Sequence, residues 1–111
     1  MKMGELYLAN AFSLGMLSDF PARLTVYEVD DRLAGDLLRR GFISCVGHES
    51  TAKIIEKRTG VKVPVQRISI KLERGDRVLV FQLLKRLPEG KVLSEEELLE
   101  IPCKWLLVEV K

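Results

Sequence analysis

The chain has 111 residues, of which 47% are hydrophobic and 31% are charged. This composition excludes a disordered chain, and the length is typical of one domain, so we expect a single domain over residues 1–111. The net charge of +2 is too balanced to indicate a nucleic-acid coat protein, and no apolar run approaches the roughly 20 residues that span a bilayer.

The residue usage also predicts where the protein works. The N-terminus does not resemble a signal peptide, and two cysteines, Cys45 and Cys103, do not make a secreted disulfide framework. We therefore expect a cytoplasmic protein. A single Asn and two Gln beside many Lys, Arg and Glu residues indicate a source that lives in a hot environment.

The first elements are two strands and a helix. Residues 5–12, ELYLANAF, are apolar nearly throughout, which predicts a buried and central strand. Residues 22–29 predict a second strand. Asp30 or Asp31 can then cap a helix whose leucines share one face, and Gly41 is a typical residue just beyond a helix end.

The middle of the chain predicts a strand, a helix and a hairpin. Residues 42–46 form a short apolar strand, and a helix from about Ser50 to Arg58 ends at Gly60. Residues 67–72 alternate between polar and apolar side chains. We expect them to pair with the apolar strand over residues 77–84 through a turn at 73–76.

The last elements are a loop, a short helix and a strand. Residues 87–91, LPEGK, predict a tight turn, and residues 94–97, SEEE, form a capping box that opens a helix ended by Pro102. Residues 105–110 close the chain as a strand. We therefore expect an α/β fold, a single domain with a central mixed β-sheet flanked by helices.

His48 and Asn10 are candidates for chemistry. His48, the only histidine, lies between a strand end and a helix start, where anions bind and where α/β sheets carry ligands. A histidine that merely caps the helix is the alternative. Asn10 interrupts an apolar strand and is followed by Ser13. It either makes a structural hydrogen bond or presents an amide to a ligand at the strand end.

Arginines and a second amide are expected near the same edge. In a regular hairpin, Arg67 and Arg86 emerge together at the end opposite the turn, and Gln82 is a second amide inside an apolar run. Two arginines, an imidazole and two buried amides make a site for phosphates and bases. Glu89 lies on the loop after Arg86, which can cover the site as a lid. A surface arginine on its own is usually only solvated, which is the alternative for each of the two.

The cysteines indicate a weaker enzymatic alternative. Cys45 and Cys103 lie beside apolar strand residues, which is typical of ordinary buried thiols. Cys45 and His48 are three residues apart, so a cysteine hydrolase remains a minor alternative. No Cys/His zinc pattern or phosphate-binding glycine loop is present in the sequence.

Four short motifs in order resemble a known family. They are LANAFS at 8–13, GHEST at 47–51, the segment 67–76 and RLPEGK at 86–91. Together they resemble the viral-type ring nucleases, the anti-CRISPR family directed against type III CRISPR signalling. The resemblance implies a homodimer that cleaves cyclic tetra-adenylate without a metal or other cofactor. We also expect no membrane association, since no apolar run is long enough to span a bilayer, and no stable nucleic-acid partner.

The resemblance also implies roles for individual residues. The catalytic histidine falls on His48 and the catalytic glutamate on Glu89. The ligand-contacting positions fall on Asn10, Ser13, Ser50, Thr51, Arg67, Gln82 and Arg86.

General chemistry is compatible with this expectation. A ribose 2′-hydroxyl can attack its own phosphate if the site aligns it, stabilises charge and protonates the leaving 5′ oxygen, for which an imidazole is the natural acid. The expected products are two linear di-adenylates, each with a cyclic phosphate at its 3′ end. The alternative function is a non-catalytic dimeric nucleic-acid-binding protein that uses the same arginines on phosphate backbones.

Overall fold

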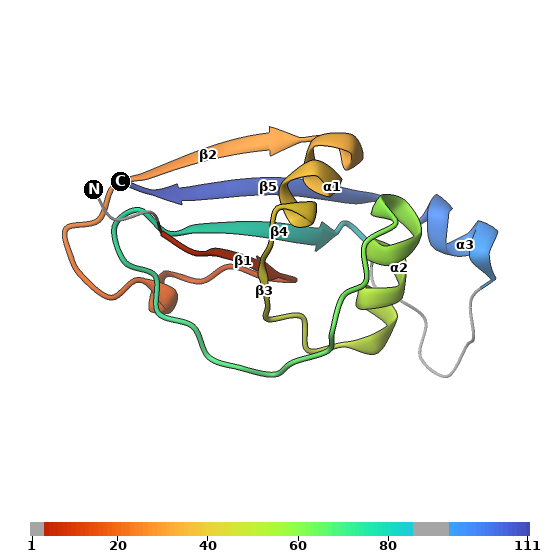
Figure 1. Cartoon of the computed structure of the whole chain (residues 1–111), viewed down its shortest axis with the longest axis horizontal. Coiled ribbons are helices and arrows are strands. Elements are labelled where there is room, and N and C mark those ends of the chain that lie inside the picture. Colours follow the sequence, from red (N-terminus) through yellow and green to blue (C-terminus); the bar gives the residue numbers. More distant parts are fainter. Residues whose placement is uncertain (1–3, 86–93) are drawn as a thin grey trace.

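A five-stranded mixed sheet forms the centre of the molecule. The computed structural model describes residues 4–85 and 94–111, and the sheet has the strand order β2-β5-β4-β1-β3 (Figure 1). The strands are β1 (Leu6–Ala9), β2 (Leu24–Val29), β3 (Ile43–Ser44), β4 (Arg77–Leu83) and β5 (Cys103–Val110). β1 runs parallel to β3 and β4, whereas β5 runs antiparallel to β4 and β2. The predicted mixed sheet is confirmed, and β1 lies inside it with a neighbour on each side.

The helices begin and end where the local sequence predicts. Helix α1 (Asp31–Arg39) is capped by Asp30, whose carboxylate accepts a hydrogen bond from Leu33 N at 2.8 Å, and Gly41 follows it with a φ of 113°. Helix α2 (Glu49–Thr59) ends at Gly60, which has a φ of 74°. Helix α3 (Glu95–Glu100) opens with the predicted capping box between Ser94 and Glu97. These boundaries form because capping needs only residues within one turn.

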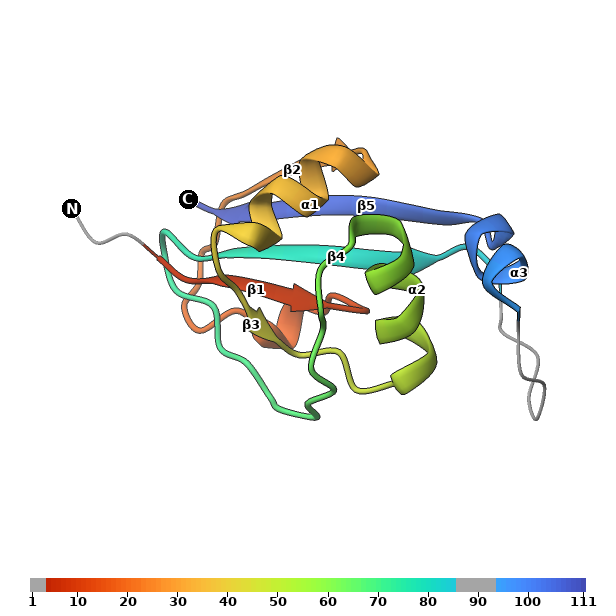
Figure 2. The same ribbon diagram turned by 45° about the vertical axis from the view of Figure 1, so that its right-hand side comes forward.

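The apolar core has one cluster on each face of the sheet. Helices α1 and α2 cover one face (Figure 2), where Leu38 and Ile55 pack against the strand residues Leu8, Leu79 and Phe81. On the other face, η1 (Leu14–Met16) and the segments beside it bring further apolar side chains onto the sheet, among them Leu17, Ile70 and Leu72. The opposite face is therefore covered by irregular chain instead of helices.

The predicted hairpin of residues 67–72 with residues 77–84 is wrong. Both sides of β4 are occupied, by β1 on one side and by β5 on the other, so no edge of β4 is free for a further strand. Residues 67–72 form no strand, and only Leu72 makes an isolated parallel bridge, to Leu17.

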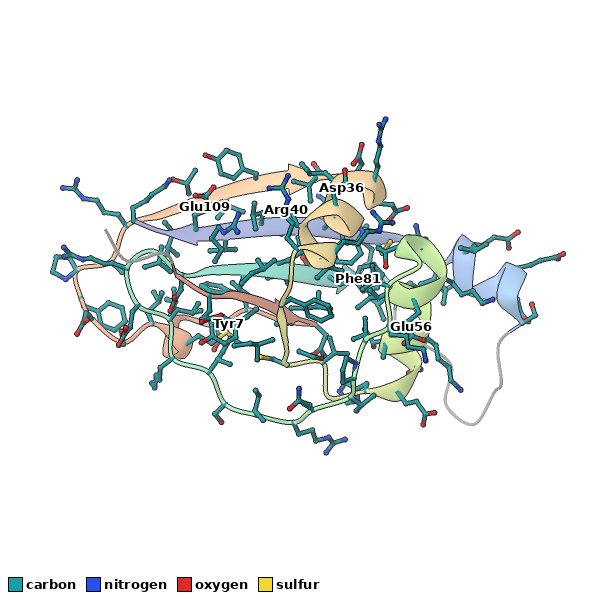
Figure 3. The ribbon with its side chains drawn as sticks, in the orientation of Figure 1. Tyr7, Asp36, Arg40, Glu56, Phe81 and Glu109 are labelled. Carbon is teal, nitrogen blue, oxygen red and sulfur yellow. The ribbon has the colours of Figure 1, made fainter. Side chains whose placement is uncertain are left out.

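The segment from residue 61 to residue 67 instead runs beside α2 and β3. Val63 N donates a hydrogen bond to a carboxylate oxygen of Glu56 at 2.8 Å, and the Ser44 hydroxyl donates to the Pro64 carbonyl. Gln66 N donates to Val46 O at 2.9 Å. Figure 3 shows Glu56, labelled on α2, near this segment. These contacts fix the chain that carries Arg67 against the turn that carries His48.

Candidate functional site

The site begins at the carboxyl ends of three parallel strands. In the register of the sheet, Leu8 of β1 lies opposite Ser44 of β3, and Ala9 lies opposite Val80 of β4. Because β3, β1 and β4 point the same way, the residues that follow or end these strands reach one edge of the sheet. Ligands of α/β proteins commonly bind at this edge.

Asn10 and Gln82 line the same groove at this edge. Asn10 is the first residue after β1, and Gln82 lies in β4 opposite Lys104 of β5. Both amides line one groove of about 310 Å³ on the face that the helices leave free. Its other lining residues are Ala11, Phe12, Val26, Val80, Leu106 and Val108. The groove therefore combines apolar walls with two amides, as small-ligand sites commonly do.

The expectation that both amides are buried is wrong. Gln82 is exposed and Asn10 is half-buried. The physical reason is that the helix-free face is covered only in part, so a side chain of β4 near the strand end meets solvent instead of a packed layer. An accessible amide needs no internal hydrogen-bond partner and is available to a ligand.

His48 lies at the start of α2 with its side chain exposed. It is the N-cap residue, its carbonyl accepts a hydrogen bond from Ala52 N at 3.1 Å, and its imidazole makes no capping hydrogen bond. The alternative of a capping histidine is therefore wrong for the side chain. An exposed imidazole beside the unpaired N–H groups of a helix start can reach an anionic ligand.

Arg67 contacts the same turn, although the predicted hairpin does not form. Its Nε donates a hydrogen bond to the carbonyl of Gly47 at 3.1 Å, immediately before His48. Its side chain is exposed. The structure thus brings Arg67 and the His48 turn together, although the two residues are far apart in the chain.

Three hydroxyl residues lie on the turns around this edge. Ser13 is the exposed residue before η1 and makes no side-chain capping bond, and Ser50 is exposed in the first turn of α2. Thr51 differs because it is only 4% exposed and faces the interior. Ser13 and Ser50 can contact a ligand in this conformation, whereas Thr51 supports the start of α2 from inside.

The remaining candidate residues are not described. Arg86, Glu89 and the predicted loop over residues 87–91 lie outside residues 4–85 and 94–111. Their roles stay predictions.

The two thiols do not favour a nucleophilic role. Cys45 and Cys103 are both half-buried and free, and burial raises the pKa of each thiol above its usual range. A reactive cysteine needs the opposite shift, toward the thiolate. Cys45 Sγ makes only a long contact of 3.9 Å, to Ile43 O.

Two further features are absent from the described residues. Within residues 4–85 and 94–111, no three His, Cys, Asp or Glu side chains lie together in a way that could hold a metal ion. In the same part of the chain, no helix has the length and apolar character needed to cross a membrane.

Sequence reasoning missed two parts of this site. The role of Gly47 does not follow from the motif GHEST, because its contact with Arg67 depends on tertiary packing. The apolar walls of the groove were also missed, because Val26, Val80 and Val108 come from three strands whose order in the sheet is non-local. The alternation of residues 22–29 does signal that Val26 and Glu28 share a face.

Comparisons with known proteins show that the chain is similar to proteins of archaeal viruses. It is 38% identical over 96 residues to uncharacterized protein 26 of Sulfolobus islandicus filamentous virus, covering 86% of this chain and 81% of that protein. It is 33% identical over 93 residues to uncharacterized protein ORF116 of Acidianus filamentous virus 1, covering 83% and 80%. These sources agree with the hot environment that the composition predicts.

A solved structure and a family match lead to the same assignment. The structure of B116 of Sulfolobus turreted icosahedral virus superposes with a TM-score of 0.81 at 30% identity, covering 96% of this chain and 99% of that one. Residues 6–105 match the family described as STIV B116-like. The chain therefore belongs to the STIV B116-like family.

Proposed function

We propose that this protein is a ring nuclease that binds cyclic tetra-adenylate and cuts it, without a metal, into linear di-adenylates. The observation that carries the proposal is the exposed His48 side chain on the turn whose Gly47 carbonyl accepts a hydrogen bond from Arg67, at the sheet edge where Asn10 and Gln82 line an apolar groove. The four-motif resemblance and the family's occurrence in archaeal viruses support it. Such an activity would switch off type III CRISPR signalling.

The proposed reaction uses the substrate's own nucleophile. The ribose 2′-oxygen attacks the adjacent phosphorus and gives up its proton to solvent, while the bond from phosphorus to the 5′ oxygen breaks. His48, in its protonated form, donates a proton to that 5′ oxygen. The phosphate remains on the 2′ and 3′ oxygens as a cyclic ester, so atoms and charge balance without a water molecule being consumed.

The other side chains bind and align the ring. The terminal nitrogens of Arg67 can pair with a phosphate that gains charge in the transition state. Asn10 and Gln82 offer donors and acceptors to an adenine edge, and the walls of the groove suit a flat base. By resemblance, Glu89 orients and stabilises the protonated imidazole, and Arg86 supplies a second phosphate contact.

A homodimer follows from symmetry. One chain has a single histidine, whereas a ring of four equal nucleotides has two-fold symmetry. Two chains related by a two-fold axis would place one His48 at each of two opposite linkages. Both cuts together would convert the ring into two identical di-adenylates.

The second candidate is a non-catalytic nucleic-acid-binding dimer. One observation favours it: Lys62, Arg67, Lys71 and Arg74 are all exposed along one irregular segment. Basic side chains of this kind contact phosphate backbones irrespective of sequence. Such a protein would use the arginines but would have no use for a free imidazole.

One substrate comparison separates the two functions. The protein is incubated with cyclic tetra-adenylate, with linear tetra-adenylate and with a duplex DNA, and both binding and cleavage are measured. We expect cleavage of the cyclic ligand alone. Tight binding of all three without cleavage would support the nucleic-acid-binding dimer, and equal cleavage of both RNAs would indicate a general ribonuclease.

A further inference from the structure

Gly47, the residue before His48, is a glycine for reasons of space. Among residues 4–85 and 94–111, the glycines with a positive φ are Gly41, Gly60 and Gly75. Gly47 is not among them, so its φ lies outside the left-handed region that favours glycine. The backbone therefore does not explain why a glycine stands at this turn.

The missing side chain makes room for Arg67. A β-carbon at Gly47 would lie 2.9 Å from Cγ of Arg67, 3.6 Å from its Nε and 3.7 Å from its Cδ. Non-bonded carbon atoms pack at about 3.5–4.0 Å, so the first of these contacts is too short. The aliphatic part of Arg67 thus lies directly against the bare α-carbon of Gly47.

The same contact orients the guanidinium. Arg67 Nε donates to Gly47 O at 3.1 Å, which fixes the side chain across the turn. The two terminal nitrogens make no hydrogen bond or ion pair with any residue that the structure describes. They remain available as a pair of donors, the arrangement with which arginine binds a phosphate.

We infer that Gly47 is a positioning residue that holds the phosphate-binding Arg67 across the turn next to His48. The inference rests on the proposed function for its ligand, cyclic tetra-adenylate. An alanine at residue 47 would push Arg67 into another rotamer and break the bond from Nε to the Gly47 carbonyl. The guanidinium would then no longer be held beside the His48 backbone.

This displacement should change binding without unfolding the protein. Arg67 is exposed, so its side chain can rotate away into solvent. An alanine at an ordinary φ also restricts the unfolded chain, which favours the folded state. We therefore expect Gly47→Ala to keep the melting temperature of the parent while it lowers the affinity for the ligand.

A double-mutant cycle tests the inference. Dissociation constants for cyclic tetra-adenylate are measured for Gly47→Ala, Arg67→Ala and the double variant, all in a His48→Ala background so that the ligand is not consumed. We expect Arg67→Ala to weaken binding about 10- to 100-fold, the value of a lost charged hydrogen bond. Gly47→Ala should weaken it almost as much, and the double variant no more than Arg67→Ala alone.

The matched control is Gly15→Ala, since Gly15 also has an ordinary φ. A β-carbon there would meet only the Ser13 hydroxyl, at 3.8 Å, which is a normal contact. This variant should bind like the parent. The inference is wrong if Gly47→Ala also binds like the parent, or if it weakens binding by the same factor when Arg67 is already alanine.

A second measurement needs no ligand. In ¹H–¹⁵N NMR spectra of the free protein, the Nε–H of Arg67 should exchange slowly with solvent because it is hydrogen-bonded. The protection should be lost in Gly47→Ala and kept in Gly15→Ala. An unchanged Nε–H signal in Gly47→Ala would overturn the inference even if cyclic tetra-adenylate proves not to bind, an outcome that would overturn the proposed function alone.

Discussion

His48 carries the proposed chemistry, and its surroundings suit a proton donor. The side chain is exposed at the first turn of α2, and no residue of the described chain occupies its nitrogens. A histidine with a purely structural role would be expected to use at least one ring nitrogen in a hydrogen bond. With respect to residues 4–85 and 94–111, both nitrogens of the imidazole are left for substrate and solvent.

Replacing His48 should separate binding from catalysis. We expect His48→Ala to keep the affinity for cyclic tetra-adenylate and to lose about 10²–10⁴-fold in cleavage rate, the usual contribution of a general acid. Single-turnover rates and dissociation constants are the measurements. Glu49→Gln, which changes the exposed neighbouring residue, is the matched control and should cleave normally. Near-normal turnover by His48→Ala would exclude the imidazole as the proton donor.

Cys45 should have no part in the reaction. Burial raises the pKa of its thiol, so the thiol stays protonated at neutral pH and gains reactivity only as the pH rises through that higher value. We expect Cys45→Ala to cleave at the wild-type rate. The rate at which iodoacetamide alkylates Cys45 should still increase with pH above pH 9. Loss of cleavage in Cys45→Ala would support the cysteine-hydrolase alternative. So would an alkylation rate that stops increasing with pH below pH 8.

The individual site residues could be predicted from the sequence only in part. His48 and Arg67 were predicted to lie near one another, and the structure brings them to one turn. The reasoning for Arg67 was nevertheless wrong, because it relied on a hairpin that does not form. Gln82 was misjudged as buried, since its exposure depends on how much of the opposite sheet face is covered, and that is a property of the whole fold.

At the scale of elements, the capping residues predicted the helix boundaries. Asp30, Gly41, Gly60 and the box from Ser94 to Glu97 act within one helical turn, so the helix boundaries follow directly from the residues. Strand pairing is different. Residues 67–72 alternate as a strand does, but the partners of β4 are β1 and β5, and this choice depends on the order of the whole sheet.

Arg58 of α2 connects this helix to α1 and to the end of α3. Its terminal nitrogens donate to the carbonyls of Leu99 and Ile101, both at 2.9 Å, and pair with Asp31 of α1 at 3.3 Å. Asp31 also accepts a hydrogen bond from the Trp105 indole of β5 at 2.7 Å. The arginine side chain is only 14% exposed. The end of α3 is thereby fixed against the two larger helices and β5.

Removal of this arginine should destabilise the fold. We expect Arg58→Met, which keeps an apolar stem, to lower the free energy of unfolding by about 2 kcal/mol, because two carbonyls and one oxygen of the Asp31 carboxylate lose this donor. The measurement is unfolding in urea, in which both variants should keep the parent's slope of unfolding free energy against urea concentration. Lys53→Met in the same helix is the control, since its exposed ion pair with Glu49 at 3.6 Å contributes about 0–1 kcal/mol. Equal changes in the free energy of unfolding for the two variants would mean that the contacts of Arg58 do not stabilise the fold.

At the scale of the whole molecule, the proposed cleavage of opposite linkages in one ring requires two chains per ligand. We expect a particle of twice 12.6 kDa in sedimentation or light scattering and one cyclic tetra-adenylate bound per two chains in a calorimetric titration of His48→Ala. The physical reason is that each chain has one histidine, so two chains are needed to place a histidine at each of two opposite linkages of the ring. A monomer that binds one ring per chain would contradict the symmetric arrangement.

The central claim is metal-independent cleavage of cyclic tetra-adenylate through the 2′-hydroxyl. The most direct test is mass spectrometry of the products after incubation of the purified protein with the ligand in excess EDTA. We expect a linear di-adenylate with a 2′,3′-cyclic phosphate as the final product, formed at the same rate with and without EDTA. An intact ring in EDTA, with cleavage restored by a divalent ion, would contradict it.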